Sequence, residues 1–186
     1  MRVFLAIEFP EDIKEYLDQI HLVLREQSKT GNFTKKDNYH LTLRFIGEIK
    51  DHELDKLKEV IDEIALKHNC FQLTKNKVGC FARGSKMIIW VGINQNETLG
   101  RLYSQLEQSL ERKGYTKEER NFVPHVTIAR QVVLMEDLKK MQQQIKMDNI
   151  IIPVSKLSLM ESTRVKGELR YIPLYTKNLS PPLMQN

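Results

Sequence analysis

The fold is decided around Tyr39-His40-Leu41-Thr42-Leu43-Arg44-Phe45-Ile46-Gly47, a stretch in which apolar and polar side chains alternate as they do in a β-strand. Side chains at positions i and i+2 of a strand point to the same face. His40 and Thr42 therefore share one face, while Leu41 and Leu43 anchor the opposite face in the core. Because a β-branched threonine has a stiff χ1 angle, the Thr42 hydroxyl is held in a fixed direction beside the imidazole.

The same pattern occurs a second time, in His125-Val126-Thr127-Ile128, directly after Pro124. Five histidines and nine threonines in 186 residues predict about 0.24 His-x-Thr triplets by chance. Two triplets, each with apolar residues at the alternate positions, exceed what chance supplies. We expect the two strands to face a common cleft and to present two imidazoles and two hydroxyls to one ligand.

Helical and strand-like patterns alternate along the rest of the chain. Apolar residues recur at helical spacing near residues 10–24, 54–65, 99–110 and 136–145, and Gly31 with Asn32 interrupts the pattern after the first helix. Further strands are expected near residues 3–9, 71–81, 86–93, 150–160 and 169–175. Several strands follow one another through short turns, which favours an α+β fold with antiparallel pairing over a doubly wound parallel sheet. No linker divides the chain, so residues 1–186 are expected to form one domain.

The composition is that of an ordinary globular protein, with 41% hydrophobic and 28% charged residues. No apolar run reaches the roughly 18 residues that a membrane span needs. Glu8 and Pro10 end the first apolar stretch too early for a secretory signal, so a cytoplasmic protein without membrane contact is expected. Cys70 and Cys80 are expected to be buried free thiols, with a disulfide between them as the alternative. The net charge of +5 suits a polyanionic partner such as nucleic acid without requiring one.

Two imidazoles and two hydroxyls around one ligand suit the cleavage of a phosphodiester. The reaction needs a base to activate the attacking oxygen and an acid to protonate the leaving oxygen, and histidine serves in either role at neutral pH. Threonine hydroxyls and an arginine can hold the nonbridging oxygens. No carboxylate–histidine cluster at metal-ligand spacing accompanies the triplets, so neither a metal nor a cofactor is expected. His21, His52 and His68 lack the pattern and are expected to face solvent.

Two arginines are candidates for contacting the phosphate. Arg44 has the parity to share a face with His40 and Thr42 if its strand is regular. Arg130 lies five residues after His125, has the opposite parity, and needs a bulge to turn inward. Parity alone leaves the choice between them open.

Two stretches carry a family resemblance, namely Tyr39-His40-Leu41-Thr42-Leu43-Arg44-Phe45-Ile46-Gly47-Glu48 and Pro124-His125-Val126-Thr127-Ile128-Ala129-Arg130. Together they resemble the paired signatures of the 2H phosphoesterases, and most closely those of the RNA 2′,3′-cyclic phosphodiesterases, which are also called 2′-5′ RNA ligases. Residues 2–7, 79–81, 87–92, 159–162 and 170–174 are similar to further strands of that group. The resemblance thus covers nearly the whole chain.

The resemblance implies two pseudo-symmetric lobes, with antiparallel sheets facing a central cleft and helices packed outside. It implies that His40 is the proton donor and His125 the proton acceptor, that Thr42 and Thr127 hold the phosphate oxygens, and that Arg130 is the arginine that binds phosphate. The implied substrate is RNA with a 2′,3′-cyclic phosphate end, or a related small cyclic nucleotide. A monomer would hydrolyse it to a 2′-phosphomonoester, and the same geometry with a 5′-hydroxyl in place of water would give 2′-5′ ligation.

Two alternatives stay open. The first is another activity of the same superfamily, on 2′-5′ oligoadenylate, on ADP-ribose cyclic phosphate or on RNA 3′ ends, because the signatures are common to all of these. The second is a non-catalytic RNA-binding module, which explains the basic charge but gives the two matched triplets no role. If the histidines catalyse as a pair, one must be charged and the other neutral, so a bell-shaped pH profile is expected.

Overall fold

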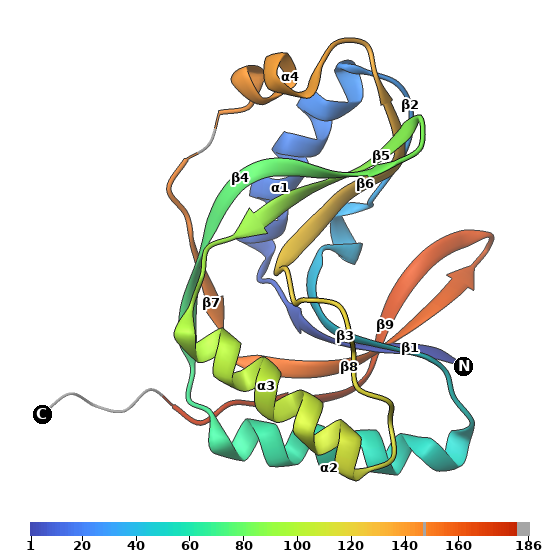
Figure 1. Ribbon diagram of the computed structural model, residues 1–186, viewed down its shortest axis with the longest axis vertical. Coiled ribbons are helices and arrows are strands. Elements are labelled where there is room, and N and C mark those ends of the chain that lie inside the picture. Colours follow the sequence, from blue (N-terminus) through green and yellow to red (C-terminus); the bar gives the residue numbers. More distant parts are fainter. Residues whose placement is uncertain (147, 182–186) are drawn as a thin grey trace, which may run out of the picture.

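The computed structural model describes residues 1–146 and 148–181, and it contains two antiparallel β-sheets that face each other across the centre of the molecule (Figure 1). The four-stranded sheet is formed, in this order, by β3 (His40–Glu48), β1 (Arg2–Glu8), β8 (Lys156–Val165) and β9 (Glu168–Asn178). The five-stranded sheet is formed, in this order, by β2 (Ser28–Phe33), β6 (His125–Leu134), β5 (Lys86–Ile93), β4 (Phe71–Arg83) and β7 (Ile151–Val154). The two His-x-Thr triplets therefore belong to different sheets.

Helices cover the outer faces of both sheets (Figure 1). On the five-stranded sheet, α1 (Glu11–Glu26) packs against β2 and β6, and the short α4 (Leu138–Gln144) lies at the end of this lobe. On the four-stranded sheet, α2 (Leu54–Lys67) packs against β8 and β9, and α3 (Glu97–Arg112) packs on α2. Two 3₁₀ turns, η1 (Lys36–Asn38) and η2 (Asp51–Glu53), flank β3. The expected α+β architecture of two lobes with helices outside is confirmed.

The apolar positions of the two triplets are built into one continuous core. Leu41 and Leu43 of β3 are 0% and 4% exposed, and Val126 and Ile128 of β6 are 1% and 0% exposed. Since alternate residues of a strand point to opposite faces, this burial turns the histidines and threonines toward the other side of each sheet. β3 and β6 contact each other there, so the polar faces of the two lobes meet.

The sequence prediction and the structure differ at three strands. β2 was not expected, because its residues Ser28 to Phe33 are mostly polar and include Gly31 and Asn32. The single strand expected near residues 150–160 is two strands, β7 and β8, in different sheets. β6 continues to Leu134, beyond the short strand that the apolar pattern indicated. Among the described residues, no helix is both long and apolar enough to cross a bilayer.

Candidate active site

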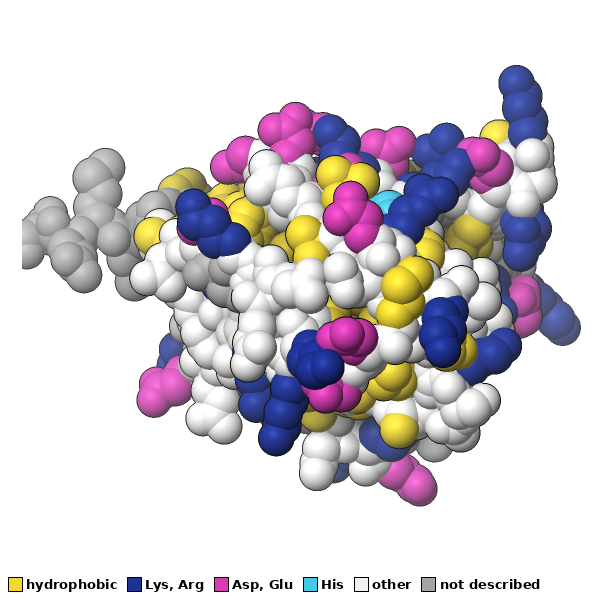
Figure 2. Space-filling view, turned by 90° about the horizontal axis from the view of Figure 1, so that it is seen from above, with side chains coloured by type: hydrophobic (Ala, Val, Ile, Leu, Met, Phe, Trp, Pro, Cys, Tyr) yellow, Lys and Arg dark blue, Asp and Glu magenta, His cyan; other side chains and the backbone are white. Residues whose placement is uncertain are grey.

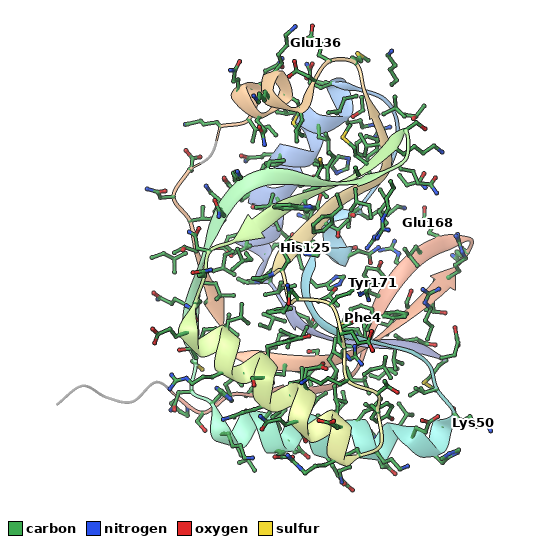
Figure 3. The ribbon with its side chains drawn as sticks, in the orientation of Figure 1. Phe4, Lys50, His125, Glu136, Glu168 and Tyr171 are labelled. Atoms are coloured by element: carbon green, nitrogen blue, oxygen red, sulfur yellow. The ribbon has the colours of Figure 1, made fainter. Side chains whose placement is uncertain are left out.

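The two imidazoles converge on one cavity between the sheets. Two histidines, three threonines, one arginine, one asparagine and one tyrosine line it, namely His40, His125, Thr34, Thr42, Thr127, Arg130, Asn38 and Tyr171. Figure 3 shows His125 on the upper lobe, with Tyr171 and Phe4 on the lower lobe on the other side of the gap. All five residues that the sequence singled out for the site are therefore brought together, although they lie up to 90 positions apart in the chain.

Both histidine rings are held in the same way. The Nδ1–H of His40 donates to the carbonyl oxygen of Asn38 at 2.8 Å, and the Nδ1–H of His125 donates to the carbonyl oxygen of Val123 at 2.6 Å. In each case the acceptor is the backbone two residues earlier. A carbonyl can only accept, so it fixes the proton of the neutral ring on Nδ1 and leaves Nε2 as the atom available for proton transfer.

Aromatic rings surround each imidazole. The His40 ring lies 4.7 Å from the Phe4 ring and 5.0 Å, edge to face, from the Tyr171 ring. The His125 ring lies 5.1 Å, edge to face, from Phe81 and 6.0 Å from Trp90. Phe81 is half-buried and contacts His125.

This enclosure lowers the pKa of both histidines. Burial lowers the pKa of His40 from 6.5 to about 4, and the positive charge of Arg130 acts in the same direction. Burial also lowers the pKa of His125, again with a smaller contribution from Arg130. At neutral pH, without a ligand, both imidazoles are therefore uncharged.

The threonines stand beside the imidazoles as the strand geometry requires. The Thr42 hydroxyl lies 2.8 Å from Nε2 of His40 and donates to it when the ring is neutral. Thr127 lines the same cavity from β6, two residues after His125. Each strand thus contributes one titratable nitrogen and one hydroxyl to the cavity.

A β-bulge in each strand decides which arginine reaches the cavity. In β6, Thr127 pairs with Trp90 but Ala129 pairs with the next residue, Ile89, so Ile128 is an extra residue. Ile128 and Ala129 are both buried as a result, and Arg130 returns to the cleft face with the triplet. The inward turn that Arg130 required is present.

The bulge in β3 has the opposite effect on Arg44. Thr42 pairs with Ala6 while Arg44 pairs with Leu5, so Leu43 is the extra residue. Arg44 is thereby turned to the helix side of the sheet. It would share a face with His40 only in a regular strand, and β3 is not regular. The Arg44 side chain points to the opposite face from the one that local alternation predicts, because pairing with β1 sets the register of β3.

Arg44 instead joins β3 to α3 and to the segment that leads to His125. Its Nε lies 3.2 Å from Glu107 Oε1, an ion pair without hydrogen-bond alignment, and its Nη1 donates to Glu118 Oε2 at 3.0 Å. It also donates to the carbonyl oxygen of Thr116. The Arg44 and Glu107 side chains are 12% and 8% exposed, so the pair is largely removed from water.

Sequence reasoning missed the residue that fixes His40 to β9. Asn38 is buried; its Nδ2 donates to the Leu169 carbonyl at 2.9 Å, and its Oδ1 accepts from the Tyr171 N–H at 3.1 Å. Its own carbonyl holds His40. Tyr171 lies in residues 170–174, which are similar to a further strand of the family, and this was the available signal; nothing in the sequence around Asn38 distinguished it.

The three remaining histidines differ in exposure. His52 is exposed, as expected. His68 is buried and its Nε2 lies 2.9 Å from Gln105 Oε1, and the His21 ring stacks on Phe33 at 5.3 Å, so the expectation of solvent exposure is wrong for both.

Cys70 and Cys80 are free thiols and are half-buried. In the part of the chain that the structure describes, no group of three or more His, Cys, Asp or Glu side chains could hold a metal ion.

Comparison with known proteins assigns the family. The family model of the 2′-5′ RNA ligase superfamily matches residues 9–166. The RNA 2′,3′-cyclic phosphodiesterase of Methanocaldococcus jannaschii is 32% identical over 78% of this chain and 80% of its own, and that of Thermotoga maritima is 29% identical over 88% and 87%. The structure is similar to Escherichia coli LigT complexed with 3′-AMP, with a TM-score of 0.72, 26% identity, and coverage of 96% of this chain and 97% of that one. With its paired triplets in one cavity, this chain belongs to the 2′-5′ RNA ligase superfamily.

Proposed function

We propose that this protein hydrolyses 2′,3′-cyclic phosphate ends of RNA to 2′-phosphomonoesters by paired histidine catalysis. The observation that carries the proposal is the single cavity into which two strands, from two sheets, each bring an imidazole and a hydroxyl. Its relatives are named RNA 2′,3′-cyclic phosphodiesterases, which supports the same substrate here. One chain supplies both imidazoles, so the proposed unit of activity is the monomer.

The proposed mechanism uses the two Nε2 atoms on opposite sides of the phosphate. His125 takes a proton from water, which attacks the phosphorus, while His40 gives a proton to the 3′ oxygen as its bond to phosphorus breaks. Thr42, Thr127 and Arg130 line the same cavity and hold the nonbridging oxygens as they gain charge. With a 5′-hydroxyl in place of the attacking water, the same steps would join RNA ends: the new P–O5′ bond forms, the P–O3′ bond breaks, and a 2′-5′ linkage remains.

The acid in this mechanism receives its proton only in the complex. Without a ligand, burial and Arg130 keep both imidazoles neutral at pH 7. A cyclic phosphate is an anion, and placing it between Arg130 and the rings offsets the charge that repels a protonated imidazole. Substrate binding therefore raises both pKa values and makes the singly protonated pair available at neutral pH.

Space for the terminal nucleoside adjoins the phosphate cavity. A neighbouring cavity of about 430 Å³ shares His40, Thr42, Arg130 and Tyr171 with it and is otherwise lined mainly by apolar and aromatic side chains, including Phe45, which is 44% exposed. Aromatic side chains stack on single-stranded bases without reading their sequence. This arrangement favours a nucleotide end over a simple phosphodiester.

The deciding experiment is product analysis with a short RNA that ends in a 2′,3′-cyclic phosphate, carried out in EDTA. The wild-type protein is expected to give only the 2′-phosphomonoester, and His40→Ala or His125→Ala should lower kcat by about 10²- to 10⁴-fold. His52→Ala is the matched control, because it removes an exposed histidine of η2 that lines neither the phosphate cavity nor its neighbour. A 3′-phosphate product would reverse the leaving-group assignment, and binding without turnover would favour the RNA-binding module.

The two roles can be separated with a nucleoside p-nitrophenyl phosphodiester. Its leaving phenolate needs no protonation, so a variant that lacks only the acid keeps more of its activity on this substrate than on the cyclic phosphate. We expect this rescue in His40→Ala and not in His125→Ala. Rescue of His125→Ala alone would exchange the two roles.

A further inference from the structure

Beside the phosphate cavity, on the five-stranded lobe, lies a second cavity with cationic side chains in its wall. It has a volume of about 400 Å³ and is lined by Asn32, Arg83, Lys86, Ile88, Arg130 and Gln131. Three of these six side chains are cations and none is an acid. The tip of the β4–β5 hairpin supplies two of the cations, and Arg130 forms part of the wall of both cavities.

The positions of the two hairpin cations reduce the stability of the β4–β5 hairpin. Arg83 and Lys86 are the last pair of the hairpin and lie directly opposite each other across the turn at Gly84 and Ser85. Like charges in directly opposite positions destabilise a β-ladder. Within residues 1–146 and 148–181, neither side chain has an acid within ion-pair distance, and the same holds for Arg130, whereas many other lysines and arginines of the chain do have such a partner. The positive charge at this cavity is therefore uncompensated by the protein itself.

Neutral hydrogen-bond donors complete the cavity wall. The Asn32 side-chain amide donates to Gln131 Oε1 at 3.2 Å, which leaves the Gln131 amide nitrogen directed to other partners. Gln131 has a φ of 53°, in the left-handed region that non-glycine residues seldom adopt, and it directly follows Arg130. A second register shift of β6, between the pairs Ile89–Ala129 and Met87–Val132, falls at this point, so Arg130 and Gln131 both line the neighbouring cavity.

The wider surface is consistent with an anion approaching from this side. Both the β4–β5 and the β8–β9 hairpins point toward the right-hand side of Figure 1. Figure 2 shows the molecule from above, and lysine and arginine side chains gather toward that same side. Such a distribution steers a polyanion toward the hairpin tips.

We infer that this cavity binds the next phosphate of the RNA, the phosphodiester on the 5′ side of the nucleoside that carries the cyclic end. Arg130 reaches both phosphates because a guanidinium presents five N–H donors in a fixed fork. The protein is then selective for ends that carry a 5′ phosphate group, as every RNA end does, over free cyclic nucleosides. This inference rests on the proposed function and adds the subsite that distinguishes an RNA end from a cyclic mononucleotide.

Three substrates test the inference: adenosine 2′,3′-cyclic phosphate with a 5′-hydroxyl, the same compound with a 5′-phosphate, and the ApA dinucleotide with a cyclic end. In the wild-type protein, kcat/KM for the second and third should exceed that for the first by roughly tenfold, the effect of one charge-assisted contact at a partly exposed site. In Arg83→Gln/Lys86→Gln this ratio should fall to near one. Lys56→Gln/Arg101→Gln, which removes two exposed cations from α2 and α3 on the outer face, should keep the wild-type ratio.

Several outcomes would overturn the inference. A wild-type ratio near one, or a ratio that survives in the hairpin variant, would mean that no phosphate is bound there. A preference for the dinucleotide without one for the 5′-phosphate compound would assign the contact to the second nucleoside. If the wild-type protein hydrolyses none of the three, the proposed function fails, and the subsite is then judged by binding of adenosine 3′,5′-bisphosphate against 3′-AMP to wild-type and hairpin-variant protein. Equal affinities of the two ligands for the wild-type protein would refute the subsite itself.

Discussion

Replacing His40 by glutamine should change how the stability of the protein depends on pH. In the folded protein, burial among Phe4, Tyr171 and the strands lowers the pKa of His40 to about 4, whereas an unfolded chain has the ordinary value of 6.5. Between these two values the unfolded state binds a proton that the folded state does not. The free energy of unfolding therefore falls as the pH falls from about 6.5 to about 4, and above 6.5 His40 contributes no pH dependence.

The size of the effect follows from the two pKa values. Each unit of difference corresponds to about 1.4 kcal/mol, so at pH 4.5 the wild-type protein should have lost roughly 2 to 3 kcal/mol through His40 alone, relative to pH 7.5. Glutamine keeps a hydrogen-bonding side chain but does not titrate. Its substitution changes stability by an amount that is independent of pH, so the difference between the two proteins isolates the histidine from the carboxylates that titrate in the same range.

Urea unfolding at several pH values between 4.5 and 7.5 measures this difference. The curve of unfolding free energy against pH should be shallower for His40→Gln than for the wild type, and the two should draw together or cross toward pH 4.5. His52→Gln, at an exposed position, should follow the wild-type slope. If the wild type and His40→Gln give parallel curves, the imidazole titrates alike in both states, and its enclosure does not have the electrostatic effect described above.

Three further outcomes follow from the site. Steady-state kinetics between pH 4 and 9 should place the maximum of kcat/KM at a more acidic pH than the maximum of kcat. The reason is that the free protein has lowered histidine pKa values and the bound phosphate raises them. Coincident maxima, or flat profiles, would contradict paired histidine catalysis. Arg130→Ala should lower kcat/KM by more than about tenfold. Arg130→Lys should keep only part of the activity that Arg130→Ala loses, since lysine lacks the guanidinium fork. A loss under about twofold in Arg130→Ala would show that Arg130 does not bind the phosphate. Arg44→Met should lower the free energy of unfolding, measured in urea, by roughly 3 to 5 kcal/mol, because it leaves Glu107 buried without its partner. Adding Glu107→Gln should restore part of the lost stability. A loss below about 1 kcal/mol would show that water already solvates the pair.

The parts of the site that depend on local geometry could be predicted from the sequence. His40 with Thr42, and His125 with Thr127, share a face because two residues separate them in a strand, and no partner strand is needed to know this. The convergence of the two triplets on one cavity also followed from their repetition. Apolar stripes at helical spacing predicted all four helices for the same local reason.

Features set by neighbouring strands could not be predicted. The extra residues Leu43 and Ile128 exchange the faces of the two arginines, yet nothing in either triplet marks a bulge, since each arises from the register with β1 or β5. β2 is an edge strand with only β6 as its partner, so its residues need no apolar alternation. Its polar composition is that of a loop, although it forms part of the sheet.

The two halves of the site also share features that cannot be read from the identities of their side chains. Each imidazole donates to the carbonyl two residues before it, but a carbonyl has no sequence identity, and Asn38 and Val123 have nothing in common as residues. The aromatic walls come from other strands in both halves. A repeated motif gives both histidines the same local chemistry, so the different roles proposed for them must come from these surroundings. His40, the ring whose pKa falls to about 4, is the one that the fold encloses more completely. At neutral pH an imidazole in that position holds a proton only beside an anion, so in the proposed mechanism proton donation is coupled to the presence of the phosphate.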